Sequence, residues 1–177
     1  MKSKLIALSA ISAGFIAVLL TLGAYIEFVD LFAVVFTAVF VIIPLYYNSY
    51  KASFLTYLVG GCVAFILSGF NFLSIVFPAY IAFFGLYPII KCLMQEKKLN
   101  KIFTFIFGLV WTIIAVYGIY FYYVLVMKQT FAGLPVWVES NIFLIIGLFS
   151  VVFYLVFDRF VYVIRLIINR YLGRIIK

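Results

Sequence analysis

The sequence contains no histidine and only two cysteines, Cys62 and Cys92, which lie far apart in the chain. The absence of histidine excludes histidine-ligated metal sites and serine–histidine–aspartate triads, and a single pair of cysteines cannot form a disulfide framework. Charge is also scarce, because only 10% of the 177 residues are charged, against about 25% in an average soluble domain. Hydrophobic residues make up 69% of the chain, and the mean hydropathy is +1.32. A soluble globule of this composition would expose a contiguous apolar surface, so we expect lipid to be the solvent.

Six apolar runs are long enough to be membrane spans, since a helix needs about 20 apolar residues to cross the hydrocarbon core. They cover residues 5–26, 31–47, 54–70, 74–94, 102–127 and 142–164. The first run continues without charge to Glu27, so we expect an uncleaved helix and not a secretory signal. The sequence predicts an all-α integral membrane protein, with six transmembrane helices in one compact bundle that forms a single domain over residues 1–177. A basic helical extension is expected at residues 165–177.

Basic residues are concentrated at the two ends of the chain and in every second connection between these runs. They lie before the first run, in the second and fourth connections and after the last run: Lys2, Lys4, Lys51, Lys91, Lys97, Lys98, Lys101, Arg165, Arg170, Arg174 and Lys177. By the positive-inside rule this pattern places both termini in the cytoplasm. Orientation and attraction to anionic lipid explain the net charge of +8, so no nucleic-acid binding is expected.

Prolines and a pair of adjacent glycines are expected to interrupt three of the predicted spans. Pro44 is expected to interrupt the second span, Pro78 and Pro88 the fourth, and Gly60 with Gly61 the third.

Small residues recur four apart on the first helix, at Ser9, Ala13 and Ala17 and at Ala10 and Gly14. Such a face lets a second helix approach closely. Two interpretations remain open, because the partner is either another helix of this bundle or a separate membrane subunit.

A six-helix protein of this size with Ala13-Gly14-Phe15-Ile16-Ala17 in its first helix resembles the substrate-binding S components of energy-coupling factor (ECF) transporters. The segment from Phe83 to Lys91 (FFGLYPIIK) and the later Phe157-Asp158-Arg159 also resemble parts of small S-component-like proteins of Gram-positive bacteria. The resemblance implies a protein of the bacterial plasma membrane whose first helix docks onto a transmembrane coupling subunit. It also implies two ABC-type ATPases as partners and a vitamin-like small molecule bound near the outer face.

The chain itself is expected to be no enzyme and to hold no cofactor or metal. It contains no phosphate-binding loop of the G-x-x-x-x-G-K-[ST] kind, so a partner must hydrolyse ATP. An intramembrane enzyme is disfavoured because no single span carries a clustered pair of acids.

The candidate ligand residues gather at the predicted outer ends of the helices. Tyr117, Tyr120 and Tyr123 fall on one face of the fifth helix, with Trp111 deeper, and rings that carry hydroxyl groups suit a planar metabolite. An interfacial aromatic belt is the alternative.

The connection from Lys128 to Ser140, with Trp137 and Glu139, either caps a pocket or rests among lipid headgroups. Asn71 and Asn141 either bind a ligand or cap helices. Asp30, with Glu27, either attracts a cationic ligand or caps the second helix.

Asp158 and Arg159 lie within the sixth run, where an ionised side chain costs about 2.5–3.5 kcal/mol on insertion scales. At 100° per residue Asp158, Tyr162 and Arg165 share one face. One interpretation is an inward polar network that acts as a coupling or proton-linked element. The other places Asp158 near the inner interface, neutralised locally, with Arg159 reaching the headgroups.

A non-transporting scaffold comparable with the rod-shape protein MreD is the alternative function. A scaffold should have a filled interior, whereas an S component should have an outward pocket lined by Tyr117, Tyr120, Trp137 or their neighbours.

Overall fold

The computed structural model describes residues 2–26, 28–71, 73–126 and 136–175, and every regular element among them is helical. The elements are α1 (Lys2–Tyr25), α2 (Asp30–Ile42), the 3-10 helix η1 (Ile43–Tyr47), α3 (Tyr50–Leu67), α4 (Val76–Ala79), the π-helix η2 (Tyr80–Phe84), α5 (Leu86–Glu96), α6 (Lys101–Leu125), α7 (Val136–Ser140) and α8 (Ile142–Ile175). Six helical stretches are long and apolar enough to cross a membrane. The predicted all-α architecture with six spans is therefore confirmed.

The spans match the apolar runs closely, and two boundaries differ for local reasons. The third helix begins at Tyr50, earlier than expected, because the Ser49 hydroxyl accepts a hydrogen bond from the Ala52 amide at 3.4 Å and caps it. The last helix continues past residue 164 to Ile175, so residues 165–175 of the basic extension belong to the same helix as the sixth span.

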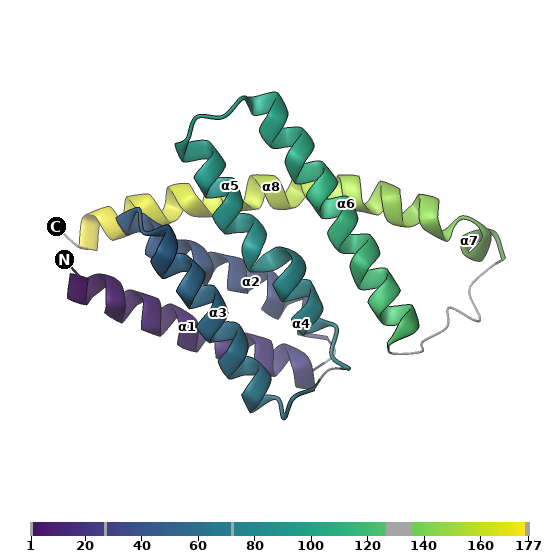
Figure 1. Cartoon of the computed structure of the whole chain (residues 1–177), viewed down its shortest axis with the longest axis horizontal. Coiled ribbons are helices and arrows are strands. Elements are labelled where there is room, and N and C mark those ends of the chain that lie inside the picture. The colour runs from purple at the N-terminus through teal and green to yellow at the C-terminus, as the bar shows by residue number, and fades with distance from the viewer. Residues whose placement is uncertain (1, 27, 72, 127–135, 176–177) are drawn as a thin grey trace.

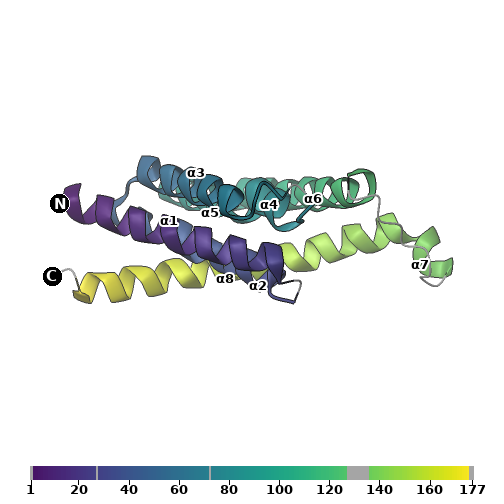
Figure 2. The same ribbon diagram turned by 90° about the horizontal axis from the view of Figure 1, so that it is seen from below.

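The helices form two layers, with α3, α4, α5 and α6 in one and α1, α2 and α8 in the other (Figure 2). The start of α1 and the end of α8 lie at the same end of the molecule (Figures 1 and 2). The η1–α3 and α5–α6 connections lie towards this end, which we call the terminal end, and the α1–α2 and α3–α4 connections lie towards the opposite, far end (Figure 1). Even-numbered connections therefore share one end, as an alternating six-span topology requires.

Gly60 lets α1 and α3 approach closely. A Cβ atom at this position would lie 2.7 Å from Cγ2 of Ile16 and 3.2 Å from the carbonyl oxygen of Ala13. The two glycines of the third span do not interrupt it, because α3 is continuous from Tyr50 to Leu67. The predicted break is wrong here, and Gly60 serves close helix packing.

The second and fourth spans are irregular at their prolines, as expected. The second span tightens into η1 at Pro44, and the fourth consists of α4 with Pro78, the π-helix η2 and α5 with Pro88. Two side chains bond to carbonyl groups of η2: the Tyr57 hydroxyl donates to Ile81 at 3.3 Å and the Trp111 indole donates to Ala82 at 3.0 Å.

Aromatic rings fill the contact between the fourth span and α8. Phe83 stacks on Tyr87 with ring centroids 5.0 Å apart, and Phe157 lies 5.0 Å from Phe83 and 5.8 Å from Phe153. Each such pair adds about 0.5–1.5 kcal/mol beyond the area it buries. This cluster fixes α8 across the bundle.

Candidate functional site

An apolar groove opens in the far-end half of the bundle, and we call it the far-end groove. Its volume is about 460 Å³, within the range of small-molecule sites. Its walls come from α2, α4, η2, α6 and α8, and include Leu31, Val34, Ala79, Phe83, Phe84, Ala115, Val116, Ile119, Phe149 and Phe153. Asp30, the first residue of α2, also lines the groove and supplies a carboxylate. The groove thus combines an apolar body with one acidic group.

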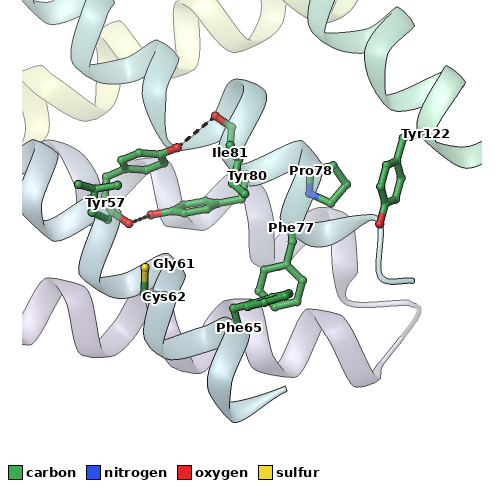
Figure 3. A pocket seen from close by; sticks show the side chains of 10 residues that line it. Tyr57, Gly61, Cys62, Phe65, Phe77, Pro78, Tyr80, Ile81 and Tyr122 are labelled. Carbon is green, nitrogen blue, oxygen red and sulfur yellow. Dashed lines mark hydrogen bonds between the residues drawn. The ribbon is translucent and has the colours of Figure 1, made fainter. Parts of the chain in front are cut away.

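A second apolar groove, of about 410 Å³, lies between α3, the α4–η2 segment and α6 (Figure 3). Figure 3 shows Tyr57 and Tyr80 side by side, with hydrogen bonds that tie α3 to η2. The Tyr80 hydroxyl donates to the Tyr57 carbonyl at 2.9 Å, and the Tyr57 hydroxyl donates to Ile81. Because both hydroxyl groups are bonded to backbone, this groove presents an apolar wall.

The predicted tyrosines of α6 meet the start of α8. The Tyr117 hydroxyl donates to the carbonyl of Phe143 at 2.7 Å, and the ring of Tyr120 packs edge-on against Phe143 with centroids 5.8 Å apart. Tyr123 is half-buried further along α6. The α6 wall of the far-end groove is formed by Ala115, Val116 and Ile119 instead. Tyr117 and Tyr120 therefore join α6 to α8, and Trp111 joins α6 to η2.

The polar residues near the far-end connections bond to nearby backbone. The Asn71 side-chain oxygen accepts from the Leu73 amide at 3.1 Å. The Asn141 amide donates to the Trp137 carbonyl at 2.9 Å, which ties the start of α8 to α7. Trp137 and Glu139 are exposed. Glu27 and residues 128–135 of the predicted capping connection lie outside the described residues.

The small-residue face of α1 divides between two environments. Ala13 and Ala17 are buried, and the carbonyl of Ser9 accepts a hydrogen bond from the Thr56 hydroxyl of α3 at 3.4 Å. Ala10 and Gly14 are exposed, and a Cβ atom on Gly14 would meet nothing within 4 Å. The first row packs inside the bundle, and the second leaves a shallow surface on α1.

Asp158 forms an ion pair with Lys91 of α5 and accepts a hydrogen bond from the Tyr87 hydroxyl at 2.8 Å. The exposed fractions of the Lys91 and Asp158 side chains are 8% and 24%. Gly108 of α6 makes room, since a Cβ atom there would lie 2.9 Å from the Tyr87 hydroxyl oxygen. The aspartate is thus neutralised by a partner on another span.

The other residues of the predicted polar face lie further along α8. Arg165 donates to the Cys92 carbonyl at 3.2 Å and to the Gln95 side-chain oxygen at 3.0 Å. Arg159 and Tyr162 are exposed. The sequence does not identify Lys91 as the partner of Asp158, although a lysine three residues inside the predicted 74–94 span is a usable signal.

These features define a multi-pass helical membrane protein with an apolar groove at one end and an ion pair between two spans near the other. Among the described residues, no group of three acidic or cysteine side chains could hold a metal ion. The chain matches no known family model, no curated protein and no solved structure.

Proposed function

We propose that this protein is the substrate-binding membrane subunit of an energy-coupling factor type importer, and that its ligand occupies the far-end groove. The observation that carries the proposal is the pairing of a 460 Å³ apolar groove with the Asp30 carboxylate. Pockets that bind small molecules combine apolar walls with a few polar groups that fix orientation. The proposed ligand is a small metabolite, vitamin-like in size, with an aromatic or aliphatic body and one cationic group.

The proposal places the terminal end in the cytoplasm. The η1–α3 and α5–α6 connections lie at that end (Figure 1), and they and the first turns after them carry Lys51, Lys97, Lys98 and Lys101, as the positive-inside rule requires of cytoplasmic connections. The far-end groove then lies towards the outer face of a bacterial plasma membrane. A substrate captured there would meet the carboxylate first.

The same proposal assigns the exposed Ala10–Gly14 surface of α1 to a transmembrane coupling subunit. A partner helix can approach this surface closely because neither residue projects a large side chain. Two ABC-type ATPases on the coupling subunit would supply ATP hydrolysis, for which this chain has no phosphate-binding loop.

Native mass spectrometry of the protein, extracted mildly from its own membrane, tests the proposal. The expected result is a stoichiometric small molecule, a complex with a coupling subunit and ATPases, or both. A ligand-free protein that co-purifies with cell-envelope proteins would contradict it. That result would favour the non-transporting scaffold, with which the ring-filled contact between the fourth span and α8 is also compatible.

A further inference from the structure

A cavity of about 730 Å³, lined by charged and amide side chains as well as apolar ones, lies at the terminal end, between the turn that joins α5 to α6 and the middle of α8. In Figure 1 the chain turns from α5 into α6 at one edge of the molecule, and α8 crosses behind both helices. Lys91, Lys98, Lys101 and Asp158 form the charged part of the lining. We call this space the basic cavity. It is separate from the far-end groove, with which it shares no lining residue.

The lining carries excess positive charge. Three ammonium groups accompany one carboxylate, which leaves a net charge of +2. Asp158 is already paired with Lys91 and accepts a hydrogen bond from Tyr87. Lys98 and Lys101 are exposed. Their charges are therefore the ones available to an anion that enters the cavity.

The uncharged amides of the lining also offer donors. The side-chain oxygen of Gln95 accepts from Arg165 at 3.0 Å, and that of Asn100 accepts from the Ile102 amide at 3.0 Å. Both side-chain oxygens thus accept hydrogen bonds from the protein. The amide nitrogens, which only donate, are the groups that can bind a ligand. Ammonium groups together with amide donors match the oxygens of a phosphate.

The turn that carries the lysines is ordered by its own hydrogen bonds. The Leu99 amide donates to the Met94 carbonyl at 3.2 Å, and Lys98 takes a left-handed conformation with φ +51°. This arrangement closes the C-terminus of α5. Asn100 then caps α6, whose first turn adds a partial positive charge near Lys101. The backbone positions of Lys98 and Lys101 are therefore fixed by one ordered turn.

We propose that the basic cavity binds the phosphate group of a phosphate-bearing ligand. Two sources share this chemistry, the headgroup of an anionic phospholipid and a soluble phosphorylated molecule. Both are accessible at the terminal end, where the exposed lysines border the end of the spans.

The test uses the full chain, purified in a zwitterionic detergent, with one probe for each source. Native mass spectrometry measures retention of phosphatidylglycerol against phosphatidylcholine from an equimolar mixture, and calorimetric titration measures binding of inorganic pyrophosphate. Preferential retention of phosphatidylglycerol alone identifies a lipid headgroup, and pyrophosphate binding identifies a soluble source. No lipid preference together with no pyrophosphate binding overturns the proposal.

A matched pair of double variants separates a specific cavity from general surface charge. Lys98→Gln/Lys101→Gln removes two charges from the lining and should weaken binding of the retained probe roughly thirtyfold. Lys51→Gln/Lys97→Gln removes two exposed charges near the same end, outside the lining, and should weaken it less than about threefold. Equal losses in the two variants also overturn the proposal. All four side chains are exposed, so circular dichroism melts should show both variants folded.

Discussion

Removal of either partner of the Lys91–Asp158 ion pair alone should strongly destabilise the protein. Breaking a buried pair leaves one uncompensated charge and typically costs about 3–5 kcal/mol. The Asp158 side chain keeps 24% of its surface exposed, so we expect the lower end of this range. Lys91→Met and Asp158→Leu should each lower the free energy of unfolding by about 3 kcal/mol.

The double variant Lys91→Met/Asp158→Leu should lose much less stability than the two single variants lose together. Both charges are then gone, and apolar side chains of similar size occupy a site already lined by Phe105 and Tyr154. Replacement of a buried pair by apolar residues is often neutral, so we expect stability within about 1 kcal/mol of the native protein.

The assay is reversible unfolding in mixed micelles, titrated with dodecyl sulfate and followed by tryptophan fluorescence. Arg159→Met is the control, because it removes an exposed charge from the adjacent position of α8 and should change stability by less than about 0.5 kcal/mol. If the double variant loses as much stability as the two single variants together, the two residues are not coupled and the reasoning is refuted.

Three further variants test the groove and the α1 surface. Val116→Trp should fill the far-end groove and abolish ligand retention, whereas Ile114→Trp, on the exposed face of the same helix, should retain it; equal retention would place the ligand elsewhere. Asp30→Asn keeps a side-chain oxygen that can accept from the Leu31 amide at the start of α2, but it removes the negative charge. A cationic ligand should therefore bind about tenfold more weakly in a direct titration, and unchanged affinity would exclude Asp30 as the group that attracts the ligand. Gly60→Val should lower the thermal midpoint of unfolding by several degrees through a clash with α1, and a stable variant would contradict the packing argument. Gly14→Val should leave this midpoint unchanged and weaken binding of a coupling subunit.

The number and type of the spans follow from the sequence because each depends on local composition alone. A run of apolar residues must become a helix in lipid, where every backbone group needs an internal partner. The rule does not set where α8 ends: the helix continues beyond residue 164, and Arg165 finds acceptors on α5. Charge marks where a span leaves the hydrocarbon, and it does not end the helix.

The partner of Asp158 and the position of the groove depend on which helices meet, and this information is not local. The sequence places Lys91 with the cytoplasmic lysines because it lies near the end of an apolar run, yet α5 packs so that Lys91 reaches Asp158 of α8. The tyrosines of α6 are candidates in the sequence because they are aromatic and polar. The groove instead lies along Val116 and Ile119 of α6, and α2 and α8 supply further walls.

The irregular fourth span connects these features. A π-helical turn adds a residue to the helical repeat and so rotates the residues after it by about 100° relative to a continuous α-helix. Lys91 follows η2 and pairs with Asp158, so the direction from which it reaches α8 depends on this turn. Each carbonyl group of the irregular turn that lacked a hydrogen-bond donor in lipid would destabilise the fold by about several kcal/mol.

Tyr57 and Trp111 supply those donors from opposite sides, at Ile81 and Ala82. Their bonds hold α3 and α6 against η2, and each of the two apolar grooves has one wall on the α4–η2 segment. A straight α-helix in this span would need neither donor and would present different side chains to both grooves. The helix break, its aromatic donors and the grooves are therefore one structural unit. A substitution of Trp111 should change the shape of the grooves while all six spans remain helical.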